Sequence, residues 1–111
     1  ARVNVRLYVW QRLTALAMVP LIAGHLATMI YAIQGGLTAK EILSRTQGSI
    51  GWALFYGAFV ILAAIHGAIG VRSVAGEWTS LRGRGLDGLM WGFGLVLALL
   101  GLRAVVAVVM P

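Results

Sequence analysis

The sequence predicts an all-α integral membrane protein, a bundle of three transmembrane helices that forms a single domain over residues 1–111. The chain is 60% hydrophobic and only 11% charged. A soluble domain of this composition would have too little polar surface to cover itself. Charged residues also bound three apolar stretches, each of about 20 residues or more, the length that a helix needs to cross the hydrocarbon core. These stretches are residues 13–33, 48–71 and 88–110.

The first predicted span, residues 13–33, follows Arg12 and contains no charged residue. A cleavable signal peptide would have a shorter apolar run that ends in small residues, so we expect this span to be retained. Pro20 lies within it and lacks the amide hydrogen that would bond to residue 16. The helix should therefore bend five residues before His25.

The other two spans follow the same pattern of charges at their ends. Residues 48–71 lie between Arg45 and Arg72 and contain no charged residue. Residues 88–110 contain only Arg103, near the far end, where a long side chain can reach the headgroups. We expect both segments to cross the membrane.

The two connections differ in character. Thr38 and Glu41 have the spacing of a capping box, in which each side chain satisfies the other's backbone amide, so the first connection should hold a short surface helix up to about Thr46. The second connection, residues 76–85, is too polar to insert and too rich in glycine to favour a firm helix. We expect it to be exposed or docked on a partner.

Basic residues are distributed unevenly between the two sides of a three-span protein. Two of them, Lys40 and Arg45, lie in the first connection. Six lie before the first span or after the second, and the positive-inside rule therefore places the N-terminus and the second connection in the cytoplasm. These six are Arg2, Arg6, Arg12, Arg72, Arg82 and Arg84.

Composition also excludes some functions. The formal net charge of +6 comes from nine basic residues scattered around three spans rather than from one patch, so we expect no nucleic-acid partner. The chain has no cysteine, which excludes thiolate metal sites and iron–sulfur ligation by this chain. Any redox cofactor must use other ligands.

Two histidines, His25 and His66, lie inside the first two spans. An ionisable residue within a span costs free energy and usually faces a partner or a cavity, which favours a functional site. Gly24 precedes His25, and Gly67 and Gly70 follow His66, leaving the clearance that a porphyrin face needs. The alternatives are a neutral histidine hydrogen-bonded to a neighbouring helix and glycines that serve helix packing.

The two histidines should lie at different depths. Helix rise places His25 ~20 Å from Arg12 but His66 only ~9 Å from Arg72, and both arginines mark the cytoplasmic boundary. The offset of roughly 10 Å is too large for one haem ligated by both residues. Either one histidine is not a ligand, or two haems are stacked across the membrane and a second chain supplies the missing axial ligands.

Three stretches resemble the membrane-anchor cytochrome b subunits of succinate dehydrogenase and fumarate reductase. Pro20-Leu-Ile-Ala-Gly-His25-Leu is similar to the first haem-ligating helix of the two-haem anchors. Ile61-Leu-Ala-Ala-Ile-His66-Gly-Ala-Ile-Gly70-Val-Arg72 is similar to the second, with its His-x-x-x-Gly pattern. Gln11-Arg12-Leu13-Thr14-Ala15 is similar to the Arg-x-Thr-Ala start of the small anchor subunit. The resemblance covers the first two spans, about two thirds of the chain.

The resemblance implies a role in electron transport. A chain of this type binds haem b, here two haems shared with a second membrane anchor subunit, with His66 and His25 as axial ligands of the haem iron. Electrons pass between a flavoprotein and iron–sulfur pair and membrane quinone, in the succinate oxidation of the tricarboxylic acid cycle or in fumarate reduction. The chain would be a non-catalytic subunit of an oxidoreductase in the bacterial cytoplasmic (inner) membrane.

Five further residues are candidates for cofactor or quinone contacts. Arg72 could bind a haem propionate or the iron–sulfur partner, or could be a positive-inside anchor. Arg12 and Thr14 could contact propionates or quinone; the alternatives are a helix-start anchor and a hydroxyl bonded back to its own helix. Glu77 and Trp78 stand where the one-haem small subunit has Asp-Tyr beside its quinone, and could instead be an ordinary interfacial pair.

Two other functions compete with this interpretation. The chain could belong to another membrane cytochrome b complex, such as a hydrogenase or formate dehydrogenase anchor, although those generally need more histidines per chain. It could also be a non-redox helper or proton-relay subunit, in which His25 and His66 carry protons.

Overall fold

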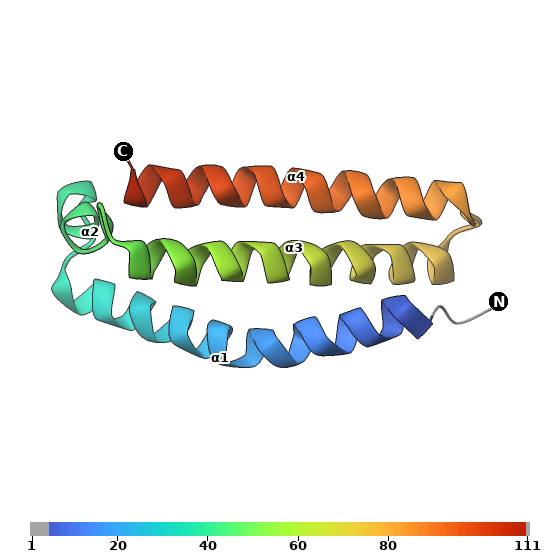
Figure 1. The fold of residues 1–111 in the computed structure, drawn as a ribbon, viewed down its shortest axis with the longest axis horizontal. Coiled ribbons are helices and arrows are strands. Elements are labelled where there is room, and N and C mark those ends of the chain that lie inside the picture. Colours follow the sequence, from blue (N-terminus) through green and yellow to red (C-terminus); the bar gives the residue numbers. More distant parts are fainter. Residues whose placement is uncertain (1–4, 111) are drawn as a thin grey trace.

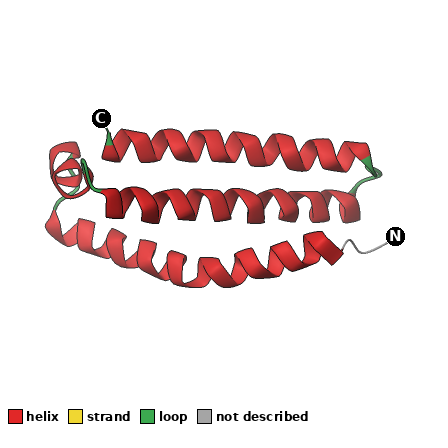
Figure 2. Cartoon of the chain, viewed as in Figure 1, coloured by secondary structure: helices red, strands yellow, loops and turns green. Residues whose placement is uncertain are grey.

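The computed structural model describes residues 5–110, and all of its regular structure is helical (Figures 1 and 2). Three long helices lie side by side, and one short helix crosses the end of the bundle. They are α1 (Val5–Gly35), α2 (Ala39–Thr46), α3 (Ile50–Trp78) and α4 (Arg84–Val109). The helices α1, α3 and α4 are each long and apolar enough to span a membrane. The predicted fold class is confirmed.

The surface of the bundle is suited to lipid and to protein partners. Large apolar side chains on all three long helices are exposed, among them Leu16 at 70%, Leu54 at 70% and Trp91 at 73%. Few of the described residues are buried within the chain itself. The bundle therefore depends on its surroundings to cover most of its apolar area.

The helices extend beyond the apolar stretches that predict them. The expectation for residues 76–85 is confirmed only in part: residues 79–83 form an exposed, non-helical connection, but α3 continues to Trp78 and α4 already begins at Arg84. Arg82 explains part of this, since its Nη1 donates to the carbonyls of Gly76 (2.9 Å) and Thr79 (3.0 Å) at the end of α3. Gly83, with φ of +57°, then turns the chain into α4.

Helix α1 remains continuous through Pro20, and its middle is bowed away from α3 (Figure 1). A proline within a helix removes one backbone hydrogen bond, and its ring pushes the preceding turn away, so the helix bends. The bend predicted from Pro20 is therefore present without a break in the helix.

Helix α3 is the centre of the bundle and packs against both α1 and α4. Close approach to α4 depends on small residues. A Cβ at Gly94 of α4 would lie 3.0 Å from the Cβ of Ala68, and one at Gly101 would lie 2.5 Å from Cγ1 of Val60. Neither neighbour is the end of a flexible side chain, so these glycines set the distance between the two helices.

We expect Gly94→Leu to destabilise the packing of α3 against α4 by about 1–3 kcal/mol, the usual cost of overpacking. Gly92→Leu is the matched control, because a Cβ at Gly92 would lie within 4 Å of no atom of another helix among residues 5–110. Thermal unfolding of the purified complex in detergent, followed by circular dichroism, measures the difference. Equal losses in the two variants would show that Gly94 is not a contact point.

The first connection closes one end of the bundle through α2. Thr38 caps this helix, and its hydroxyl accepts from the Glu41 amide (3.2 Å) and donates to the Glu41 carboxylate (2.6 Å). The predicted helix is confirmed, although Glu41 contacts the hydroxyl of Thr38 rather than its amide. Thr46 is buried and donates to the carbonyl of Val108 (2.6 Å), while the Gly48 amide donates to Val109 (2.8 Å). The end of α2 and the residues that follow it thus donate hydrogen bonds to carbonyls at the end of α4, which have no partner within α4.

The start of α1 and the connection between α3 and α4 lie at one end of the bundle, opposite α2 (Figure 1). The arginines at that end include Arg6, Arg12 and Arg82, whereas Lys40 and Arg45 belong to α2. Arg2 lies outside the described residues. The topology agrees with the predicted separation of charge, and the cytoplasmic position of that end remains a prediction of the positive-inside rule.

Candidate functional site

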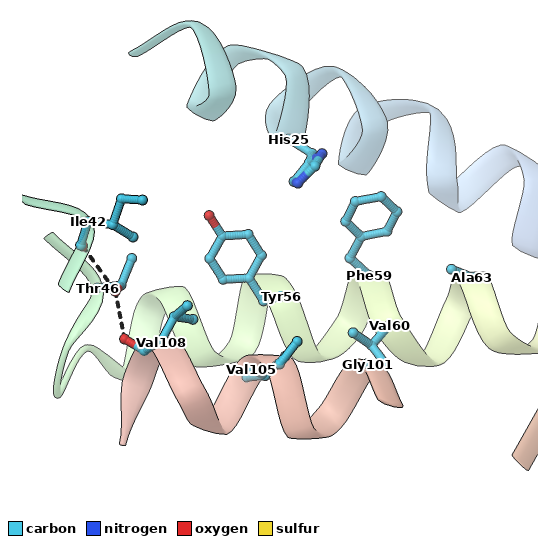
Figure 3. Close-up of a pocket in the computed structure, with 11 residues that line it drawn as sticks. His25, Ile42, Thr46, Tyr56, Phe59, Val60, Ala63, Gly101, Val105 and Val108 are labelled. Carbon is cyan, nitrogen blue, oxygen red and sulfur yellow. Dashed lines mark hydrogen bonds between the residues drawn. The ribbon is translucent and has the colours of Figure 1, made fainter. Parts of the chain in front are cut away.

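His25 and His66 lie in two separate grooves between the helices. The His25 groove has a volume of about 440 Å³ and is mostly apolar. Figure 3 shows the His25 side chain extending from α1 toward α3, with α2 and the end of α4 at the far side of the groove. The groove is lined by His25, Ile42, Thr46, Tyr56, Phe59, Val60, Ala63, Gly101, Ala104, Val105 and Val108.

Aromatic side chains of α3 hold the His25 ring. The ring is half-buried, and its centroid lies 5.1 Å from that of Phe59 and 6.3 Å from that of Tyr56, both in edge contacts. Gly24 brings α1 close to α3, since a Cβ there would lie 3.1 Å from the ring of Phe55. Within residues 5–110 the His25 ring nitrogens form no hydrogen bond. Its imidazole is held by packing and keeps both nitrogens for other partners.

The His66 groove is larger, about 620 Å³, and lies toward the end of the bundle where α1 begins. It too is mostly apolar. It is lined by Gln11, His66, Gly67, Gly70, Val71, Val74, Ala75, Trp78, Thr79, Phe93 and Leu97. Gly67 and Gly70 line this groove, but side chains of neighbouring helices pack against both: a Cβ at Gly67 would lie 3.2 Å from Leu97, and one at Gly70 would lie 3.5 Å from Gln11. These glycines therefore serve helix packing here, and clearance for a porphyrin beside His66 remains a prediction.

The two imidazoles lie at different heights in the bundle. His25 packs against Phe59, and seven residues of α3 separate Phe59 from His66, a rise of about 10 Å. His66 contacts Thr14, and eleven residues of α1 separate Thr14 from His25, a rise of about 16 Å. The offset along the bundle is thus about 10–16 Å.

Both grooves run along one side of the bundle. The residues of α3 that line them recur at intervals of three and four, at positions 56, 60, 63, 67, 70 and 74. The lining positions of α4 do the same, at 93, 97, 101, 105 and 108. Such spacing places each set on one helix face. The grooves are therefore stacked along α3, with α1 on one flank and α4 on the other.

Thr14 lies directly behind His66. Its side chain is buried, with 1% of the residue exposed. The hydroxyl donates to the backbone carbonyl of Trp10 (2.8 Å), with that of Gln11 at 3.1 Å, and lies 3.4 Å from Nδ1 of His66. The back-bonded hydroxyl considered from the sequence is present, and Thr14 does not line either groove.

Gln11 is a site residue that the sequence argument missed. It lines the His66 groove, and its Oε1 atom is buried without a hydrogen-bond partner among the described residues. Its Nε2 lies 3.5 Å from the position that a Cβ of Gly70 would take. An unsatisfied buried polar atom costs about 1–3 kcal/mol, so the carboxamide is a candidate contact for a bound group. The signal available in the sequence was its position one helical turn before Thr14.

The candidate arginines lie outside both grooves. Arg72 Nε is 3.0 Å from Oδ1 of Asp87, an ion pair that joins α3 to α4. The guanidinium of Arg12 lies over the ring of Tyr8, 5.5 Å from its centroid. The structure thus gives each arginine a partner within the chain, and neither lines the pockets around the histidines.

The two candidate quinone residues, Glu77 and Trp78, differ in their position relative to the His66 groove. Trp78 lines the end of the His66 groove that lies nearest the start of α1, and is 83% exposed. Glu77 does not line the groove. The structure therefore brings Trp78, and not Glu77, to the neighbourhood of His66.

The grooves suit a planar apolar cofactor that carries its own metal ligands. In residues 5–110 no three histidine, cysteine, aspartate or glutamate side chains cluster closely enough to hold a bare metal ion. Each groove instead offers one half-buried imidazole and mostly apolar walls. Histidine is a common ligand of haem iron, so these residues are compatible with a haem, and haem binding remains a prediction.

Fold and grooves together define a multi-pass helical membrane protein with an imidazole in each of two apolar grooves. A family model described as the succinate dehydrogenase/fumarate reductase transmembrane subunit matches residues 1–107. The chain belongs to this family, so it is a membrane anchor subunit of such a complex. No curated protein and no solved structure matches the chain significantly. The resemblance seen in the sequence is confirmed at the level of the family.

Proposed function

We propose that this chain is the haem b-binding anchor of a succinate dehydrogenase or fumarate reductase complex in the bacterial cytoplasmic membrane. In it, electrons pass between an iron–sulfur subunit and membrane quinone. The observation that carries the proposal is the pair of grooves, each with one imidazole and apolar walls, in a chain of this family.

The proposal includes two haems rather than one. The imidazoles of His25 and His66 are offset by about 10–16 Å along the bundle, which is too far apart for both to hold the same haem. His25 and His66 are then ligands of different haems. A second membrane anchor subunit, seated along the side on which both grooves lie, supplies the opposing ligands.

The chain's own residues bind and orient the cofactors. When bound, haem supplies one-electron transfer. His25 and His66 would each hold a haem iron through a ring nitrogen, and the apolar walls would limit the access of water, which influences the reduction potential. Gln11 offers its carboxamide to a polar edge of the group held by His66. The ion pair of Arg72 with Asp87 joins α3 to α4 outside the two grooves.

The partners of the proposed complex lie on different sides of the chain. The flavoprotein and iron–sulfur subunits occupy the cytoplasmic end, where α1 begins, and catalysis at the dicarboxylate belongs to them. Quinone reaches the same end of the groove from the lipid. The exposed side chain of Trp78 lines that end of the groove and is the candidate contact for the quinone ring.

The haem content of the complex tests this function. We expect the complex, purified from its host with its natural partners, to contain two b-type haems that dithionite reduces and a fumarate or quinone acceptor reoxidises. Visible difference spectra and a pyridine haemochrome assay measure the number of haems per complex. The absence of a b-haem signal would overturn the proposal, and a single haem would overturn the assignment of both histidines as ligands.

A further inference from the structure

We infer that Thr14 is a positioning residue that fixes the tautomer and orientation of the His66 ring. The inference rests on the proposed function, because it concerns His66 as a haem ligand. It gives Thr14 a role different from direct contact with propionate or quinone.

The direction of each hydrogen bond follows from the partners of the Thr14 hydroxyl. A hydroxyl has one proton and two lone pairs, whereas a carbonyl oxygen can only accept. The proton of Thr14 is therefore directed at the carbonyls of Trp10 and Gln11, at 2.8 and 3.1 Å. Toward Nδ1 of His66, 3.4 Å away, the hydroxyl oxygen can then only accept. Nδ1 carries the proton.

A neutral imidazole with a proton on Nδ1 has its free lone pair on Nε2. This is the nitrogen on the other side of the ring from Thr14, and His66 itself lines the groove. A metal-ligating histidine usually donates its other ring N–H to a neighbouring acceptor, which fixes the ring and makes the ligand more basic. Thr14 is such an acceptor, and it is almost fully buried between α1 and α3.

The contact also joins two helices at a defined height. Thr14 belongs to α1 and His66 to α3. Because the hydroxyl is bonded back to its own helix, the position of its oxygen is fixed by the backbone of α1. His66 is consequently held from a different helix than its own. His25 differs, since only ring packing holds it within residues 5–110.

Thr14→Val tests the inference, because valine keeps the shape of threonine and removes the acceptor. We expect the haem held by His66 to shift to a higher midpoint potential, since a less basic imidazole stabilises ferric iron less. The potential of the second haem should not change. Thr14→Ser keeps the oxygen and should restore the wild-type value. Redox titration of the purified complex at the b-haem absorbance measures both potentials, and His66→Ala identifies which haem is which.

Thr28→Val is the matched control. Thr28 lies on the same helix and its hydroxyl also bonds back to a carbonyl, that of His25 at 2.7 Å, but it does not touch an imidazole. Wild-type potentials for both haems in Thr14→Val, or an equal shift in Thr28→Val, would overturn the inference. Loss of the His66 haem in Thr14→Val with retention in Thr14→Ser would support it. These outcomes can be told apart from a failure of the proposed function, because in that case the wild-type complex itself would contain no b-type haem.

Discussion

Replacing His66 with alanine is expected to remove the haem nearest the cytoplasmic end and to halve the haem content of the complex. Alanine offers no nitrogen to the iron, and no other histidine lines the His66 groove. The His25 groove shares none of its lining residues with the His66 groove, so the outer haem should remain. A pyridine haemochrome assay and a redox titration of the purified complex measure the loss.

Phe93→Ala is a suitable control for His66→Ala. Phe93 lines the same groove without a nitrogen to donate, so its removal should perturb the haem environment while leaving the haem in place. Complete loss of both haems in His66→Ala, with the subunits still assembled, would contradict the division into two sites. Loss of the same single haem as in His25→Ala would contradict the difference in height.

Replacing His25 with alanine is expected to remove the outer haem and again to halve the haem content. The imidazole is the only titratable nitrogen that lines this groove, and its neighbours Tyr56 and Phe59 have no nitrogen in their side chains. Electron transfer to the dicarboxylate site with an artificial donor should persist, because that chemistry belongs to other subunits. Spectra taken at defined potentials show which haem signal is missing.

Tyr56→Phe provides the control for His25→Ala. It keeps the aromatic ring whose centroid is 6.3 Å from that of His25 and removes only the hydroxyl, so both haems should be retained. If His25→Ala kept two haems with unchanged potentials, His25 would be a packing residue rather than a ligand. Retention of every haem in both histidine variants would favour the proton-relay alternative.

The sequence predicted the fold well because each rule it used depends on local composition. Three apolar stretches give three long helices, Thr38 and Glu41 give α2, and Pro20 gives the bend in α1. Hydropathy marks the apolar layer rather than the end of a helix, so it did not predict that α3 continues through polar residues to Trp78. At the end of α3, the side chain of Arg82 donates hydrogen bonds to the backbone carbonyls of Gly76 and Thr79. A local sequence pattern does not predict such contacts.

The site was predicted only in part. Intramembrane histidines are conspicuous in a sequence, and helix rise alone separates them in height. The partners of other side chains depend on how the helices are rotated against one another. The sequence alone does not show how the helices are rotated. It therefore could not predict that Arg72 pairs with Asp87 or that Gln11 lines the His66 groove. The role inferred for Thr14 also requires that its hydroxyl on α1 lie at the same height in the bundle as the His66 ring on α3.

The stacking of both grooves along one side of α3 sets a requirement on the sequence of the partner. Its two ligating nitrogens must match the heights of His25 and His66, which differ by about 10–16 Å. On one helix that offset corresponds to about seven to eleven residues, and spacings of seven and eleven both return a side chain to nearly the same face. On two helices the residues can lie anywhere along the chain, provided that the helices present them at those heights. The second anchor can thus be sought among the membrane proteins of the same host as a chain with two histidines in its spans at heights about 10–16 Å apart.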